Sequence, residues 1–128
     1  MNIPADLRYS SDHEWIRREP GTDEVTIGIT DYAQDSLGDV VFVEAPEVGR
    51  VVGAAETFTE VESTKSVSDV YAPVNGTITS INDRLDGEPQ LLNSDPYGDG
   101  WICVIEMSDP SQYDELLDAA GYQALTEG

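Results

Sequence analysis

The stretch from residue 25 to residue 30 alternates between apolar and small residues, with Val25, Ile27 and Ile29 separated by threonine and glycine. This period of two residues is that of a β-strand with one buried face, and it does not fit an amphipathic helix. Other runs rich in β-branched or aromatic residues follow, and Gly, Pro or polar residues separate them. They lie at about 40–44, 57–62, 67–71, 76–81 and 101–107. The sequence therefore predicts a mostly β fold.

A short internal helix is expected between the first two of these strands. Asp31 followed by Gln34 resembles a helix-capping pair, in which side chains bond the free N–H groups of the first turn. Gly38 is suited to end the helix, because helices commonly stop at a glycine in a left-handed conformation. We therefore place this helix at about 31–37.

The C-terminal region changes to a helical pattern. Pro110 after Asp109 is typical of a helix start, because proline is favoured at the first helical position. Gly121 would end the helix, and a short tail would follow. One apolar helix face is formed by residues at the spacing i, i+3, i+4 and i+7, namely Tyr113, Leu116, Leu117 and Ala120. We expect a single domain over 1–128 with a C-terminal helical segment at about 110–127.

The pattern Ala-Pro-x-x-Gly-x-(Val/Ile) occurs twice, at 45–51 and at 72–78. Each copy would turn the chain and start a strand. Two explanations remain open at this point. Turn and strand signals recur by chance, or the domain is a β-sandwich of two related halves, as in swinging-arm carrier domains.

The balance of charge excludes two classes of partner. The chain has 26 acidic residues against 6 basic ones, which gives a formal net charge of −20. Nucleic acid and anionic membranes attract clustered lysine and arginine, so neither is an expected partner. The acidic residues are spread along the chain, which indicates a solvated surface rather than an acidic tail. With 39% apolar residues, the chain of 128 residues can still bury one core.

Lys65 is the only lysine, because all the other basic residues are arginines. Loss of lysine together with an excess of acids suggests adaptation to a salt-saturated cytosol, where the Debye length is about 3 Å at 1 M salt. We therefore expect a halophilic host. A lysine retained in such a chain needs a functional reason. Its neighbours Thr64 and Ser66 are small and polar, which favours an exposed amine that accepts a covalently attached group.

A Schiff-base enzyme is the alternative use of a single functional lysine. Such a lysine needs a desolvated pocket that lowers its pKa from about 10.4, and polar neighbours do not suit that environment. The rest of the sequence offers little catalytic chemistry. His13 is the one histidine, no Cys/His cluster could ligate zinc, and no glycine-rich phosphate loop follows a strand. We therefore expect a carrier and not an enzyme.

Cellular location follows from what the sequence lacks. The first seven residues do not form the apolar core of a signal peptide, and no stretch approaches the roughly 20 apolar residues of a membrane span. We expect a cytoplasmic protein. Cys103 is the only cysteine, so no internal disulfide can form, and its apolar neighbours predict a packed core thiol.

Four sequence blocks, in order and over nearly the whole chain, resemble the H-protein family of the glycine cleavage system. They are HEW at 13–15, GITDYAQDSLGDVVFVEAPEVG at 28–49, ESTKSVSDVYAPVNG at 62–76 and LLNSDPYGDGW at 91–101. The resemblance implies a barrel-sandwich hybrid fold of the lipoyl/biotinyl-carrier type. It also implies that Lys65 is the attachment site of (R)-lipoate.

The same resemblance gives roles to two residues near Lys65. The family has a glutamate three residues before the lysine and a glycine eleven residues after it, and Glu62 and Gly76 fill these positions. Both would serve recognition by the lipoate-attaching enzyme. A biotin carrier is the alternative of the same class, but biotin-accepting lysines usually lie between two methionines. Thr64 and Ser66 flank Lys65 instead, so we expect lipoate.

The resemblance further implies what the carrier visits. Family members take an aminomethyl group from glycine on the pyridoxal-phosphate decarboxylase (P-protein) and present it to the aminomethyltransferase (T-protein). Dihydrolipoamide dehydrogenase (L-protein) then reoxidises the arm. A lipoyl protein that relays lipoate to other complexes is the alternative of the same fold. Because carriers that visit several enzymes are usually monomers, we expect a monomer.

Family members also dock the loaded arm in a surface cleft. Glu14 and Asp69 match cleft positions, where a carboxylate would pair with the ammonium form of the cargo. Asp12 stands where relatives often have serine and would add a charge near the amine. Tyr32 stands where many relatives have histidine, which puts in doubt an imidazole near the arm. We expect His13 to be structural.

Overall fold

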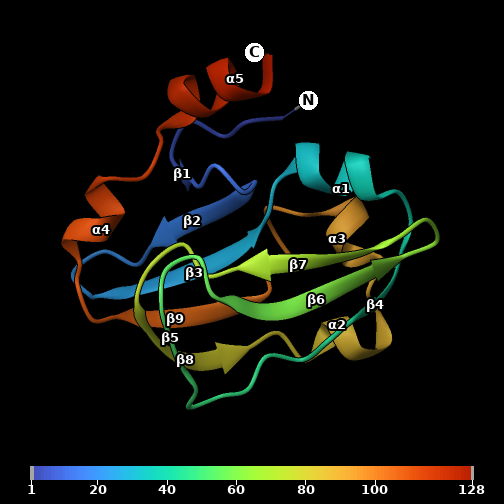
Figure 1. Ribbon diagram of the computed structural model, residues 1–128, viewed down its shortest axis with the longest axis horizontal. Helices are drawn as coiled ribbons and strands as arrows, with labels where there is room; N and C mark the ends of the chain where they lie inside the picture. The colour runs from blue at the N-terminus through green and yellow to red at the C-terminus, as the bar shows by residue number, and fades with distance from the viewer. Residues whose placement is uncertain (1, 128) are drawn as a thin grey trace.

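The computed structural model describes residues 2–127, and its core lies between two antiparallel β-sheets (Figure 1). One sheet has six strands in the order β1-β2-β3-β9-β8-β5, and the other has three in the order β4-β6-β7. The first sheet consists of β1 (Arg8–Tyr9), β2 (Glu14–Arg18), β3 (Glu24–Ile29), β5 (Val51–Val52), β8 (Gly76–Ile81) and β9 (Cys103–Met107). The second consists of β4 (Val40–Val43), β6 (Thr57–Ser63) and β7 (Val67–Tyr71). The predicted mostly β, barrel-sandwich architecture is confirmed.

Each run that was expected to be a strand overlaps one of these strands. Apolar side chains from both sheets form the main core, including Ile27 and Ile105 from the larger sheet and Val61 and Val70 from the smaller one. Cys103 is completely buried, as predicted, and burial raises the pKa of its thiol to about 12.

The expectation that β3 has only one buried face is wrong. Its small residues are buried as well, because a second apolar cluster covers the other face. The indole of Trp15 lies directly against Gly28, its partner across the β2–β3 ladder, where no side chain would fit. The hydroxyl of Thr30 bonds to Tyr122 from the C-terminal helix. Gly28 in β3 thus makes room for one aromatic ring, and Thr30, just after the strand, bonds to another.

The internal helix α1 (Asp31–Leu37) has the predicted bounds. Its cap, however, is Thr30 and not Asp31, because the Thr30 side chain accepts a hydrogen bond of 3.2 Å from the Ala33 N–H. Asp31 instead accepts a bond of 2.7 Å from the Gln34 side chain within the first turn. Gly38 ends the helix, as predicted, with a φ of 80°.

A C-terminal helix is present, as predicted, but the prediction of one continuous helix with a single apolar face is wrong. The structure has two short helices, α4 (Ser111–Asp114) and α5 (Ala119–Glu127), and Gly121 lies inside α5 instead of ending a helix. Between them Leu117 exchanges two backbone hydrogen bonds with Tyr9, of 2.8 and 2.9 Å. This β-bridge draws the chain out of helical geometry. It also places α5 beside the N-terminal segment, at the top of Figure 1.

The two copies of the Ala-Pro-x-x-Gly pattern meet in space. β5 pairs antiparallel with the start of β8, so that Val51 lies opposite Thr77 and Val52 opposite Gly76. Backbone bonds from Gly49 to Ile78 (2.7 Å) and from Ile78 to Arg50 (2.9 Å) extend this pairing. Two halves related by a local two-fold axis would pair in this way, so the contact favours the interpretation as related halves.

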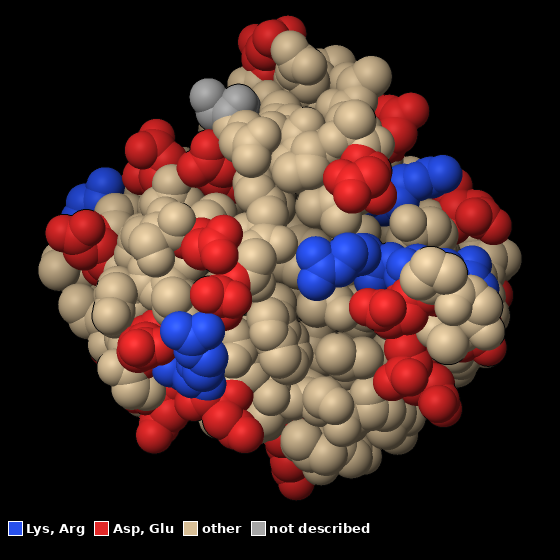
Figure 2. All heavy atoms as spheres, turned by 180° about the vertical axis from the view of Figure 1, so that it is seen from behind, with Lys and Arg blue, Asp and Glu red and all other residues tan. Residues whose placement is uncertain are grey.

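Two short helices, α2 (Arg84–Gly87) and α3 (Leu91–Ser94), connect β8 to β9 and were not predicted. The acidic side chains are spread over the surface, as expected, and Figure 2 shows one such face. Exposed ion pairs such as Arg50–Glu56 and Arg84–Glu88 join some of them, and pairs of this kind contribute little to stability. Among residues 2–127, the structure has no helix long and apolar enough to cross a membrane.

Candidate functional site

Lys65 lies at the tip of the hairpin between β6 and β7, which extends past α1 and α3 in Figure 1. Its side chain is exposed. The sequence Thr-Lys is not a favoured hairpin turn, and the side chain of Ser63 explains how it is held. Ser63 Oγ accepts hydrogen bonds from the N–H of Lys65 (3.2 Å) and of Ser66 (3.1 Å). The Ser63 N–H donates to the Ser66 carbonyl at 2.8 Å and closes the turn.

A cavity of about 280 Å³ lies beside this tip, between α1 and β7. All three carboxylates that the sequence analysis placed in a cleft, Asp12, Glu14 and Asp69, line it. Ser66, the neighbour of Lys65, lines it too, so the cleft opens next to the acceptor lysine. The other lining residues are His13, Ile29, Tyr32, Ala33, Ser36, Leu37, Val61, Ser68 and Val70. The cleft thus combines apolar walls with carboxylates.

Glu14 differs from the other two carboxylates because it is buried, with 2% of its surface exposed. The Ser10 hydroxyl donates to Glu14 Oε1 at 2.6 Å, and the Tyr71 N–H donates to Oε2 at 3.4 Å. Burial raises the pKa of Glu14 to about 7, and the bond from Ser10 only partly opposes this effect. None of the ion pairs found within residues 2–127 involves Glu14. A cation that enters the cleft would therefore favour the ionised form of this carboxyl group and could pair with it.

His13 and Tyr32 form an aromatic part of the cleft wall. Their rings stack with centroids 4.5 Å apart, and His13 has a left-handed backbone with a φ of 68°. Nδ1 of His13 lies 2.8 Å from the Tyr122 hydroxyl. Burial lowers the pKa of His13, which favours the neutral ring. Tyr32 therefore supports the histidine ring from one side.

The two residues assigned to lipoylation recognition lie in different places. Glu62 is exposed on β6, opposite Val67, immediately before the hairpin tip. Gly76 is buried at the start of β8 in the other sheet. A side chain at Gly76 would overlap the backbone carbonyl of Glu106 and the side chain of Ile105. The need for glycine there thus follows from strand packing.

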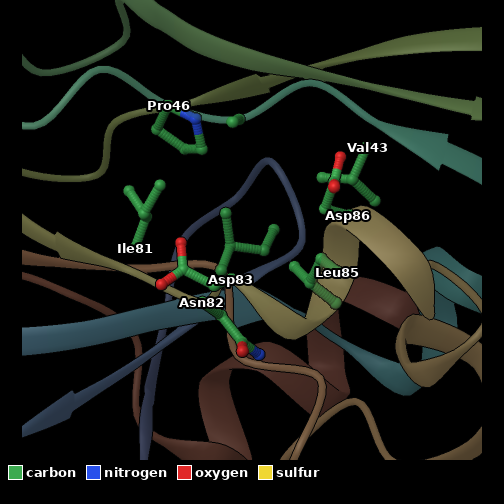
Figure 3. A pocket seen from close by; sticks show the side chains of 9 residues that line it. Val43, Pro46, Ile81, Asn82, Asp83, Leu85 and Asp86 are labelled. Atoms are coloured by element: carbon green, nitrogen blue, oxygen red, sulfur yellow. The ribbon is translucent and has the colours of Figure 1, made fainter.

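A second cavity of about 210 Å³ lies between the end of β4, the end of β8 and α2 (Figure 3). Asp83 and Asp86 stand among apolar residues such as Val43 and Leu85. Its buried polar side chain, Asn82, has its donors satisfied within the protein, since its amide nitrogen donates to the carbonyls of Asp99 and Trp101 at 2.7 Å each. This cavity contains none of the predicted site residues.

Sequence comparison shows the family to which the chain belongs. The sequence model of the family described as "Glycine cleavage H-protein" matches residues 7–128. The chain belongs to this family. The glycine cleavage system H protein of Mycobacterium avium (strain 104) is 56% identical over 131 residues, covering 98% of both chains. That of Symbiobacterium thermophilum is 54% identical over 126 residues, covering 98% of this chain and 97% of the relative.

A solved structure of the H-protein family shows the same fold. The crystal structure of a glycine cleavage system H protein from Mycobacterium marinum is 43% identical and superposes with a TM-score of 0.88. The match covers 98% of this chain and 100% of that one. The H-protein resemblance drawn from four sequence blocks is thus confirmed over the length of the chain.

Several residues of the site were missed by sequence reasoning. Ser10 bonds Glu14 from a loop, Ser63 holds the lysine turn, and Tyr122 reaches His13 from the far end of the chain. The serines have no sequence signal, because their partners are set by loop geometry. Tyr122 lies directly after Gly121, in the part of the chain that was expected to form a short tail after the helix.

Proposed function

We propose that this chain carries a lipoyl group on the Nζ of Lys65 and transports the aminomethyl group of glycine from the P-protein to the T-protein. The observation that carries the proposal is the position of the only lysine, exposed on a rigid hairpin tip beside a cleft with a buried carboxylate. Its family membership supports the same role.

The surroundings of Lys65 suit covalent attachment of (R)-lipoate through an amide. Two paired strands and the Ser63 bonds hold the tip in one shape that an attaching enzyme can bind. The exposed side chain leaves the amine accessible. An enzymatic Schiff base would need a desolvated amine, so exposure favours the carrier over that alternative. Glu62, exposed just before the tip, would contact the lipoate-attaching enzyme, and Gly76 would act through the fold.

A lipoyl group on Lys65 would supply a disulfide that can accept the aminomethyl group and be restored by the L-protein. The residues of the chain would bind the arm and protect its aminomethyl cargo from water. Leu37, Val61 and Val70 offer apolar walls to a hydrocarbon arm. Glu14, aided by Asp69 and Asp12, would pair with the ammonium group of the cargo. Enclosure would keep water from the labile cargo.

Tethering explains why a carrier helps three enzymes in turn. A group held on a flexible arm stays at a high effective concentration for each partner that the carrier meets. The chain would need only transient contacts with the P-protein, T-protein and L-protein. At high salt these contacts would depend on shape and apolar contact more than on long-range charge. The halophilic host, the cytoplasmic location and the monomeric state stay predictions.

Reconstitution with the partner enzymes tests the proposal. Lipoylated protein is mixed with P-protein, T-protein, L-protein and the reduced folate that accepts the one-carbon unit on the T-protein, and glycine-dependent reduction of the dinucleotide used by the L-protein is followed. We expect turnover with the wild type and none with Lys65→Arg, which keeps the charge but cannot form the amide. A lipoylated protein that supports no turnover would contradict glycine cleavage and favour the lipoate relay.

A further inference from the structure

Gly38 lies directly under the side chain of Lys65. A Cβ atom placed on Gly38 would come within 2.9 Å of Lys65 Cε, 3.6 Å of Nζ and 3.8 Å of Cδ. Real Cβ atoms almost never approach another atom as closely as the first of these distances, so any larger residue would displace the lysine. The outer half of the lysine side chain therefore crosses the end of α1 over a residue that has no side chain.

The backbone around Gly38 is fixed by a single side chain from α3. The amide nitrogen of Asn93 donates to the Gly38 carbonyl at 2.8 Å and to Gln34 Oε1 at 3.0 Å. Its oxygen accepts from the Val40 N–H at 2.8 Å. This loop in turn holds the hairpin tip, because the Thr64 N–H donates to the Asp39 carbonyl at 3.0 Å. The loop and the tip are thus joined as one unit.

This contact lies at the edge of the cleft. Leu37, directly before Gly38, lines the cleft, and so does Ser66, directly after Lys65. An arm that continues from a lysine lying on Gly38 starts beside these two residues. The cleft between α1 and β7, which contains Glu14, is therefore next to the point where such an arm begins.

We propose that Gly38 is a positioning residue that seats the stem of Lys65 and directs the attached arm into the cleft. The proposal rests on the proposed function, since it assumes that Lys65 carries the arm. A seated stem has fewer rotamers to lose when the arm docks, and this favours the docked state. A side chain at position 38 would lift the stem toward solvent and favour the undocked state.

Backbone strain is a separate reason for glycine at position 38. A control variant at Gly21 separates this strain from the contact with Lys65. Gly21 has a φ of 77°, close to the 80° of Gly38, but a Cβ placed there meets nothing within 4 Å. Alanine at either position brings the strain of a positive φ, and at Gly38, where ψ is −156°, the backbone lies in a region that is essentially restricted to glycine. Only Gly38→Ala also contacts Lys65.

The variants are lipoylated, loaded with the aminomethyl group, and compared for the rate at which the cargo is lost to hydrolysis. We expect a several-fold faster loss for Gly38→Ala than for the wild type, and an unchanged rate for Gly21→Ala. Thermal unfolding of both variants measures the strain separately. Equal cargo lifetimes in a folded Gly38→Ala protein and in the wild type would overturn the proposal.

A second measurement needs no variant and no modification. NMR of the unmodified wild-type protein should show nuclear Overhauser effects between the α protons of Gly38 and the outer methylene protons of Lys65. The same contacts should persist after lipoylation. Their absence in the unmodified protein would show that the Lys65 side chain does not lie on Gly38, and this would overturn the proposal even if Gly38→Ala fails to fold. Failure of Lys65 to become lipoylated would instead contradict the proposed function, so the two failures are distinguishable.

Discussion

The Tyr122 hydroxyl in α5 lies 2.8 Å from Nδ1 of His13, which joins the C-terminal helix to the wall of the cleft. The same hydroxyl lies 2.7 Å from Thr30 Oγ1. Because Thr30 Oγ1 already accepts from the Ala33 N–H, its own hydrogen is free to donate to Tyr122. A chain in which Thr30 donates to Tyr122 and Tyr122 donates to Nδ1 satisfies all three groups with a neutral His13 ring, the form that burial favours.

Tyr122→Phe should weaken this connection while keeping the ring that stacks on Tyr9. Losing the hydroxyl leaves Thr30 and His13 without their partner, at a cost of about 1–3 kcal/mol in the free energy of unfolding. The pKa of His13 should rise, because a bond that favours the neutral ring is gone. Denaturant unfolding and an NMR titration of the single histidine measure the two effects. Tyr113→Phe, whose hydroxyl has no hydrogen bond within residues 2–127, should change neither.

Glu14→Gln should shorten the lifetime of the aminomethyl cargo without preventing lipoylation. Glutamine keeps the size of the side chain and an acceptor for Ser10, but it removes the charge that would pair with ammonium. Hydrogen bonds to charged groups contribute about 1.5–3 kcal/mol, so we expect hydrolysis to be faster by about tenfold or more. The rate of cargo loss is the measurement, and Glu106→Gln, exposed on β9, is the control. An unchanged lifetime would rule Glu14 out of the cleft role.

The raised pKa of Glu14 also predicts how stability depends on pH. The folded protein holds the Glu14 proton up to about pH 7, whereas the unfolded chain releases it near the ordinary value of 4.5. Stability must therefore fall as the pH rises between these values, by about 3 kcal/mol from this group. Unfolding of the wild type and of Glu14→Gln at pH 5 and pH 8 isolates the contribution. The wild type should lose stability relative to the variant over this range, and parallel behaviour would contradict the burial of an ionisable Glu14.

Ser63→Ala should slow lipoylation, because the hairpin tip loses the acceptor for the N–H groups of Lys65 and Ser66. A more mobile tip presents the amine in many orientations, so kcat/KM of the lipoate-attaching enzyme should decrease several-fold. Ser80→Ala, an exposed serine on β8, provides the control. Equal rates for the two variants would show that the turn does not depend on the Ser63 side chain.

Local patterns predicted the strands well, because β-branched runs between Gly and Pro turns are specified by neighbouring residues. Local patterns gave wrong predictions where contacts with distant segments override the local preference. The apolar spacing that includes Leu117 favours a helix, but the bridge to Tyr9 overrides it. Thr30 caps α1 although Asp31 looked like the cap, since Asp31 bonds instead to Gln34. The strand β2 was missed because its sequence mixes charged residues with apolar ones.

Some residues of the site could be predicted from the sequence and others could not. Lys65 could be found from composition, and the carboxylates came from the family resemblance. Nothing local marks Glu14 as buried, because its burial depends on segments far along the chain, such as β7. The role proposed for Gly38 was also invisible in the sequence, where this residue was no more than a helix end. Its contact with Lys65 exists only after the hairpin folds against α1 and α3.

The modification state of Lys65 tests the central claim most directly. The protein is produced in cells with an active lipoate-attaching enzyme, and its intact mass and the mass of the peptide that contains Lys65 are measured. The account predicts one lipoyl increment per chain, located on Lys65, and none in Lys65→Arg. An unmodified Lys65 in cells that lipoylate their other carriers would contradict it.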